Sequence, residues 1–186
     1  MRIKPFGVEQ WMNEYENHCT YNLAETCVES LTVEELLALT GHQGTLMAEL
    51  LPMKLTYGAI EGSDRLRSAI AALYDRQGAE NVLITHGAIG ANHLVHLTLV
   101  EPGDRVVPVV PAYQQHYSIP DSIGADVRIL RLREENGWLP DLDELPDLDG
   151  EQAKLVAITN PNNPTGALMD RALLEQVVEI CDRAGA

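Results

Sequence analysis

The second half of the chain alternates between short apolar runs and stretches with helical spacing, and this alternation is what most constrains the fold. Short runs of mostly aliphatic residues predict strands at residues 81–85, 105–110, 126–132 and 155–158. Apolar residues at helical spacing predict helices over residues 91–100, from residue 111 and from residue 170. Because such units connect parallel strands by right-handed crossovers, the sequence predicts an α/β fold with a mostly parallel sheet sandwiched by helices.

The N-terminal part of the chain is irregular and helical by comparison. Thr32 and Glu35 have the spacing of a capping box, which predicts a helix that ends near Gly41. Ser63 is expected to cap a second helix, which stops at Gly78. We therefore place a boundary near residues 52–57, between the irregular part and the α/β part.

Residues 8–17 form a short polar segment at the start of the chain. Trp11 and Tyr15 stand at helical spacing within it and give a small apolar stripe. The segment is either an arm that docks on a neighbouring subunit or domain, or a frayed terminus.

Charge and composition argue against several classes of function. The formal net charge is −15 over 186 residues, which argues against non-specific nucleic-acid binding because that needs a basic surface. No apolar stretch is long enough to span a bilayer, so no membrane partner is expected. Cys19, Cys27 and Cys181 form neither a disulfide framework nor a zinc pattern, so we expect a cytoplasmic location.

A glycine-containing turn follows the first predicted strand. His86-Gly87-Ala88-Ile89-Gly90 separates the strand at 81–85 from the helix at 91–100. The backbone N–H groups of Ala88 and Ile89, at a helix N-terminus, suit a phosphate group. Turns of this kind also serve close packing alone, and this one lacks both the Walker lysine and the full dinucleotide fingerprint.

Two further strand ends carry candidate binding residues. Tyr113 follows a strand and a proline, so its ring either lies flat over an aromatic ligand or packs at a helix start. The string Asn160-Pro161-Asn162-Asn163-Pro164-Thr165-Gly166 follows the last predicted strand, and each Asn before a Pro is kept out of the helical region. The Asn163 amide suits a phenolic oxygen. A phosphorylated aromatic cofactor would satisfy all three strand ends together.

A metal site is the alternative use of the histidines near the glycine turn. His93 and His96 stand three residues apart on the predicted helix and are candidates to share a metal with His86 or His116. No acid or cysteine completes the set at ligand spacing, so no metal site is expected.

The three strand ends, in this order, resemble those of the class I/II aminotransferases. The likeness rests on Thr85-His86-Gly87-Ala88, on Pro111-Ala112-Tyr113 and on the string from Asn160 to Gly166. Tyr57, Gly62 and Arg67 are also spaced as in that family, so the likeness covers residues 57–186. Members of the family are fold type I enzymes that use pyridoxal 5′-phosphate.

The resemblance implies a role for each matching residue. Gly87, Ala88 and Ile89 would hold the cofactor phosphate, although Ile89 replaces a residue that often has a polar side chain. Tyr113 would stack on the pyridine ring. Asn163 would donate to the phenolic oxygen of the ring, and its bond to Pro164 is expected to be cis.

The resemblance also implies roles for residues that do not belong to the three strand ends. Tyr57 would reach the phosphate bound by a neighbouring subunit, which implies a homodimer with shared active sites. Glu25 and Thr26 would lie over the substrate. Residues 1–56 would form an N-terminal arm and part of a small domain, and residues 57–186 would form the first part of the large cofactor-binding domain.

The catalytic lysine of the family has no match in this chain. The lysines are Lys4, Lys54 and Lys154, and none stands at the position of the lysine that forms the Schiff base. We therefore expect the chain to be the N-terminal part of a longer enzyme, or a truncated product, that shows no turnover by itself.

Three functions follow as hypotheses. The first is a pyridoxal-phosphate-dependent aminotransferase that acts on amino-acid and keto-acid substrates through a Schiff base. The second is a lyase, cyclase or oxidase on the same scaffold, because a fold does not fix the reaction. The third is a catalytically inactive half-domain that serves as a partner or regulator.

Overall fold

The computed structural model describes residues 2–16, 18–24, 27–145 and 153–186. The chain divides into two compact units, of which one is Ala24–Thr85 and the other joins Met1–Leu23 to His86–Ala186. We describe each unit by itself. The division into domains at residues 56 and 57 stays a prediction.

A parallel sheet forms the centre of the larger unit. Its central strand is β1 (Arg105–Val110), and three further strands pair with β1 in parallel, namely β2 (Asp126–Val127), β3 (Leu130–Arg131) and β4 (Leu155–Ala157). Val106 pairs with both Val127 and Leu155, so β2 and β4 lie on opposite edges of β1. The predicted parallel sheet is therefore confirmed.

β2 and β3 are two paired parts of one extended segment. Both keep the same register along β1, with Val106 opposite Val127 and Val109 opposite Leu130. The Arg128 N–H, between them, donates to the Val106 carbonyl at 2.9 Å. The strand predicted over residues 126–132 thus runs beside β1 as expected, with a short interruption in regular pairing.

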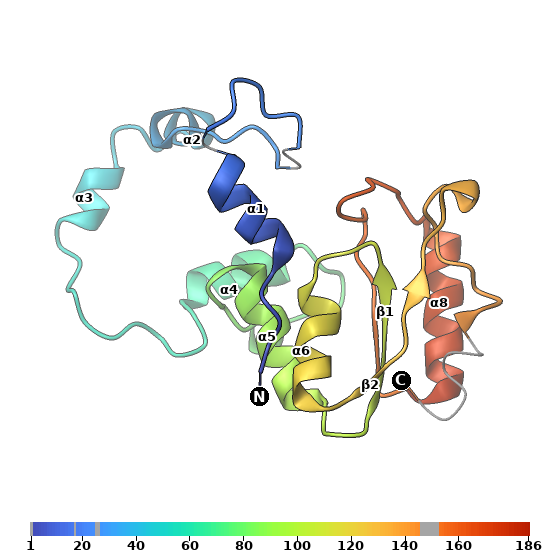
Figure 1. The fold of residues 1–186 in the computed structure, drawn as a ribbon. Helices are drawn as coiled ribbons and strands as arrows, with labels where there is room; N and C mark the ends of the chain where they lie inside the picture. The colour runs from blue at the N-terminus through green and yellow to red at the C-terminus, as the bar shows by residue number, and fades with distance from the viewer. Residues whose placement is uncertain (1, 17, 25–26, 146–152) are drawn as a thin grey trace. The chain divides into compact units, whose positions relative to one another are not determined.

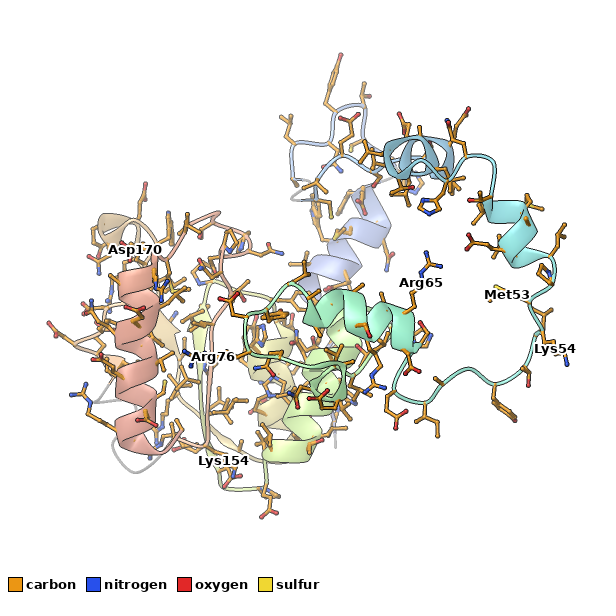
Figure 2. All side chains as sticks on the ribbon, turned by 180° about the vertical axis from the view of Figure 1, so that it is seen from behind. Met53, Lys54, Arg65, Arg76, Lys154 and Asp170 are labelled. Atoms are coloured by element: carbon orange, nitrogen blue, oxygen red, sulfur yellow. The ribbon has the colours of Figure 1, made fainter. Side chains whose placement is uncertain are left out.

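Helices cover both faces of this sheet (Figure 1). α5 (Gly87–Leu99) and α6 (Gln115–Ile123) lie on one face, and α8 (Arg171–Ala184) lies on the other. α8 starts where the sequence predicts, because the Asp170 carboxylate accepts from the Leu173 N–H at 2.8 Å (Figure 2). α6 ends at Gly124, with φ 98°, while Pro120 lies inside the helix.

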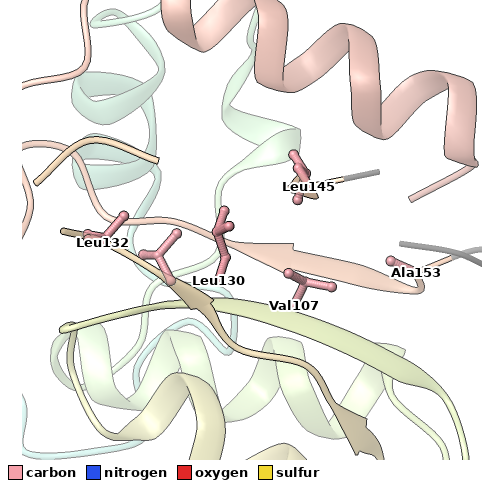
Figure 3. Packing of buried hydrophobic residues seen from close by; sticks show 6 residues of the cluster. Val107, Leu130, Leu132, Leu145 and Ala153 are labelled. Carbon is pink, nitrogen blue, oxygen red and sulfur yellow. The ribbon is translucent and has the colours of Figure 1, made fainter. Parts of the chain in front are cut away.

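The main core lies between the sheet and α8 (Figure 3). Its buried members come from the strands and from the segments that flank them: Val107, Val109, Leu130, Leu132, Leu145 and Ala153. Ile180 of α8 packs against this cluster. Side chains alternate along a strand, so Val107 and Val109 point to the same face. Each buried Val or Leu contributes roughly 1.5–3 kcal/mol, which fixes β1 and hence the loops at its end.

The smaller unit consists of short helices around a limited core. They are α2 (Val33–Thr40), α3 (Leu46–Leu50), α4 (Asp64–Ala71) and the 3₁₀ helix η1 (Ala79–Asn81). The predicted capping box at the start of α2 is confirmed, because the side chain of Thr32 accepts from the Glu35 N–H and Glu35 accepts from the Thr32 N–H. Among the described residues of this unit, Ala71 is the one buried apolar side chain.

The strand predicted at residues 81–85 is absent from the described part of the chain. Asn81 ends η1, and residues 82–85 run without regular pairing. Arg67 explains this arrangement, because its guanidinium donates to the carbonyls of Val82 and Ala79 at 2.9 and 2.7 Å. Arg67 thus binds one carbonyl of the predicted strand, that of Val82, while the Ile84 N–H donates to the Glu61 carbonyl. α4 ends at Ala71, earlier than the predicted stop at Gly78.

Two helical segments of the larger unit remain. α1 (Gly7–Tyr15) carries Trp11 and Tyr15, whose ring centroids are 5.8 Å apart, in agreement with their helical spacing. η2 (Glu134–Asn136) follows β3. Within the described residues, we find no helix with the length and apolar character that crossing a bilayer requires.

Candidate functional site

The loops after β1 and β4 meet at one edge of the sheet. The two strands are parallel neighbours, so their carboxyl ends, at Val110 and Ala157, lie at the same edge. The side-chain amide of Asn162 donates to the Pro111 carbonyl at 3.1 Å and so joins the two loops directly. Two of the three predicted strand ends are thereby brought together.

Asn162 is the anchor of the asparagine-proline loop. It is 5% exposed, and its amide donates a second hydrogen to the Thr165 hydroxyl at 2.9 Å. Its backbone holds the loop from both sides, with its N–H donating to Ala167 and its carbonyl accepting from Gly166. Sequence reasoning missed this role, because the Pro111 carbonyl that Asn162 binds is 51 residues away in the chain.

Asn160 closes the same loop at its base. Its side-chain amide donates to the Met169 carbonyl at 3.0 Å, and its side-chain oxygen accepts from the Met169 N–H at 2.9 Å. This pair of bonds resembles one step of a β-ladder and ties the start of the loop to Met169, two residues before α8. The loop therefore presents its middle residues from a fixed frame.

Asn163 is the residue that this frame presents. Its side chain is exposed and has no hydrogen-bond partner among the described residues. Its peptide bond to Pro164 is cis, which confirms the prediction. The two adjacent asparagines thus differ in function: Asn162 builds the loop, and Asn163 offers a free amide at the sheet edge.

Tyr113 stands at the end of β1 with its ring held at two points. Its hydroxyl donates to Glu9 Oε1 at 2.7 Å, and the Phe6 ring meets its ring edge-on, with centroids 5.8 Å apart and planes at 88°. Burial, followed by the hydrogen bond to Glu9 and its negative charge, raises the pKa of the Tyr113 phenol to about 12. Sequence reasoning could not find Glu9, which is 104 residues away.

The third strand end forms the first turn of α5. The helix begins at Gly87, so the expectation of a non-helical turn over residues 87–90 is wrong. The positive φ of 71° at Gly87 explains the early start, because glycine adopts it without strain and the chain can enter the helix abruptly. Gly87, Ala88 and Ile89 are exposed, and the first N–H groups of a helix have no intrahelical acceptor.

Gln115 links this turn to the rest of the site. It is 1% exposed, and its side-chain amide donates to the Ile89 carbonyl at 2.7 Å. Because Gln115 is two residues beyond Tyr113, α6 holds the first turn of α5 and the aromatic ring in one frame. Through Gln115 and Asn162, the three predicted strand ends form one connected structure.

The structure does not test the other predicted site residues. Tyr57 belongs to the smaller unit, where it is fully exposed. Glu25 and Thr26 lie outside the described residues. Their roles stay predictions.

Two histidines pack between α5 and α6. His96 is 2% exposed, and its ring centroid is 6.0 Å from that of His116. Burial lowers the pKa of His116, and burial together with the nearby His116 and His93 lowers the pKa of His96 to about 4. Among the described residues there is no group of three or more side chains arranged to hold a metal ion.

None of the lysines follows the carboxyl end of a strand of the sheet. Lys154 comes just before β4, at its amino end, where its N–H donates to the Arg105 carbonyl (Figure 2). Lys4 pairs with Asp121 at 3.0 Å. Lys54 is exposed in the smaller unit, on the loop between α3 and α4 (Figure 2).

A comparison with known protein families identifies the relatives of this chain. The family model described as aminotransferase class I and II matches residues 29–186. The chain belongs to this family. The parallel sheet with helices on both faces is accordingly part of a fold type I large domain, as predicted.

Individual aminotransferases and related enzymes support this membership. A PLP-dependent aminotransferase from Streptococcus suis is 47% identical, with a TM-score of 0.95 over 100% of this chain and 50% of that protein. Capreomycidine synthase from Streptomyces vinaceus is 35% identical over 88% of this chain and 42% of its own length. A structure described as the PLP-dependent cyclase OrfR is 26% identical, with a TM-score of 0.88 over 100% of this chain and 48% of its own. The chain thus spans about half the length of these class I and II relatives.

Proposed function

We propose that the protein binds pyridoxal 5′-phosphate at the carboxyl edge of its sheet and transfers amino groups between amino acids and keto acids. The observation that carries this proposal is the connected frame of Asn162 and Gln115. It presents a free amide, an aromatic ring and the N–H groups of a helix start at one sheet edge.

The first turn of α5 fits the phosphate of this cofactor. Its exposed N–H groups, at Ala88 and Ile89, are donors without intrahelical acceptors, and the helix dipole favours a negative charge there. A Cβ atom added at Gly87 would lie 3.8 Å from the Ile89 side chain, which is an ordinary van der Waals distance, so the turn has room for it. The positive φ, rather than crowding, favours glycine at this position.

Tyr113 and Asn163 fit the ring of the cofactor. Tyr113 would cover one face of the pyridine ring with a neutral phenol, and the free Asn163 amide would donate to the phenolic oxygen. When bound, the cofactor supplies an electron sink for charge that develops on the substrate. The residues of this chain would bind and orient it, and the lysine of the reaction would come from a position outside this set.

Assembly and location are further parts of the proposal. We infer that the protein is a homodimer in which Tyr57 of one subunit reaches the phosphate bound by the other, while Glu25 and Thr26 lie over the substrate. The exposed position of Tyr57 is compatible with contact to a second chain. We also propose a cytoplasmic location, because the three cysteines are reduced thiols and a reducing compartment keeps thiols in this state.

A cyclase reaction is the second candidate function. The similarity to capreomycidine synthase in sequence and to the PLP-dependent cyclase in structure favours it, because a synthase and a cyclase are not named for amino transfer and one fold can carry several reactions. A cyclase would consume an amino acid without passing its amino group to an added keto acid. An assay for the new amino acid formed from that keto acid therefore separates the two reactions.

Cofactor binding is the first test of the proposal. Equilibrium dialysis of the protein that carries this chain against pyridoxal 5′-phosphate should show saturable binding. Asn163→Ala should weaken it by about tenfold, the value of a hydrogen bond to a charged acceptor. Asn136→Ala, at an exposed asparagine of η2, is the matched control and should leave binding unchanged. Equal affinities for Asn163→Ala and the unaltered protein would refute the role of Asn163.

A further inference from the structure

The segment that leads into α1 is docked on the residues after β1. Lys4 pairs with Asp121 at 3.0 Å, and Gln114 donates from its side-chain amide to the Pro5 carbonyl at 3.0 Å. The Gly7 N–H, the first of α1, donates to Gln114 Oε1 at 3.1 Å. The start of the chain is therefore docked within its own unit and not frayed, and docking of this segment on a neighbouring subunit stays a prediction.

Two neighbouring residues attach the first turn of α1 to the site. The side-chain oxygen of Gln114 accepts from the Gly7 N–H at the start of the helix. Tyr113 donates its hydroxyl hydrogen to Glu9 in the same turn. The second carboxylate oxygen of Glu9 is buried and has no partner among the described residues. A carboxylate held in this way has few alternative positions, because its helix is fixed at both Gly7 and Glu9.

The contacts of the Tyr113 ring restrict its two main motions. A hydrogen bond at the hydroxyl fixes the far end of the ring and hence its tilt, but leaves rotation about the ring axis free. The edge-on contact with Phe6 opposes that rotation, because a turning ring would collide with Phe6. Glu9 and Phe6 together thus define the plane of the ring.

This attachment comes from a part of the chain that the family model does not cover. The match begins at residue 29, whereas Phe6, Gly7 and Glu9 precede it. Tyr113 therefore lies within the part of the chain that the family model matches, whereas the residues that hold its ring, Phe6 and Glu9, lie before that part.

We propose that Glu9 is a positioning residue for Tyr113, which fixes the plane of its ring against the cofactor and keeps its phenol protonated. The proposal rests on the proposed function, in which Tyr113 covers the pyridine ring. The charge of Glu9 opposes a second negative charge on the phenol, so the ring stays a neutral donor. The geometry and the raised pKa of Tyr113 agree with this role.

The first test titrates the phenol in the protein without cofactor. The ultraviolet absorbance of tyrosinate is compared up to pH 11 in the unaltered protein and in Tyr113→Phe. The difference gives the fraction of Tyr113, one of the six tyrosines of this chain, that is ionised at pH 11, and this fraction gives the midpoint even where it lies near pH 12. Glu9→Gln should lower the midpoint of Tyr113 by roughly one pH unit, because the charge is lost. Glu14→Gln removes the same charge from an exposed position of α1 and should have no effect.

The second test asks whether the effect passes through the ring. Glu9→Gln should weaken pyridoxal 5′-phosphate binding by about fivefold in the unaltered background and have no effect in the Tyr113→Phe background. An unchanged phenol midpoint in Glu9→Gln would overturn the proposal, and so would equal weakening in both backgrounds. If the unaltered protein binds no cofactor, the proposed function fails, together with the role of the ring against the cofactor. The titration still decides whether Glu9 fixes the phenol.

Discussion

At the scale of single residues, the site depends on two adjacent asparagines with opposite tasks. Asn162 is buried and uses both amide hydrogens inside the protein, on Pro111 and Thr165. Asn163 is exposed and uses none of its hydrogens on the described residues. The motif predicted a binding amide at Asn163, but it could not predict the anchor. The acceptor on Pro111 is 51 residues away and meets Asn162 only in the folded chain.

The first prediction separates the structural role of Asn162 from the proposed binding role of Asn163 by changing each asparagine to aspartate. Asn162→Asp replaces a donor by an oxygen that faces the Pro111 carbonyl, so it should lower the free energy of unfolding by about 2–3 kcal/mol. Asn163→Asp makes the same change at an exposed position and should alter stability by less than about 0.5 kcal/mol, while cofactor binding is lost. Urea unfolding measures both variants. Similar stability losses at the two positions would contradict the division of roles.

At the scale of secondary-structure elements, the predictions succeeded where local signals decide. The start of α8 near residue 170, the capping box of Thr32 in α2 and the apolar run of β1 each depend on signals within a few residues. The strand predicted at 81–85 failed because a strand also needs a neighbour. There the Val82 carbonyl accepts from the Arg67 side chain instead of from a neighbouring strand, and no periodicity in the sequence reports such a contact.

The packing of α5 against α6 leads to a prediction about acid. The pKa of buried His96 is about 4 in the folded protein, below its usual value of 6.5, because burial and two histidines disfavour its charge. Below pH 6.5 the unfolded chain therefore binds more protons than the folded chain, and stability falls as the pH falls from about 6.5 toward 4. His96 alone should remove about 2 kcal/mol between pH 7 and pH 5.

Urea unfolding at several pH values measures this loss. His96→Gln removes the titrating group, so its stability should depend less on pH over this range. His42→Gln, at an exposed position of the smaller unit, serves as the control and should keep the full acid dependence. An acid dependence that is the same in His96→Gln and the unaltered protein would assign the loss to other groups.

At the scale of the whole molecule, the smaller unit differs from the larger one in how much apolar surface it covers. Leu39, Leu55, Tyr57 and Ile60 are largely or fully exposed there, whereas the sheet of the larger unit has a continuous buried cluster. Exposed apolar surface of this kind favours a protein–protein interface. In the proposed homodimer, a second subunit would cover surface of this kind.

The last prediction tests the second subunit directly. If Tyr57 of one subunit serves the phosphate of the other, each site combines Asn163 of one chain with Tyr57 of its partner. Tyr57→Phe and Asn163→Ala should then each weaken cofactor binding by about tenfold as separate homodimers. A hybrid dimer of the two variants has one site with both defects and one site with neither.

Mixing the two variants, with unfolding and refolding to exchange subunits, should therefore restore tight binding. Random exchange makes half of the dimers hybrid, so about a quarter of all sites should bind pyridoxal 5′-phosphate with the unaltered affinity. If each site instead takes Tyr57 and Asn163 from the same chain, no site in a hybrid dimer is intact. The mixture would then bind the cofactor as weakly as the separate variants. The number of tight sites, measured by equilibrium dialysis, thus decides whether a complete site needs one copy of this chain or two.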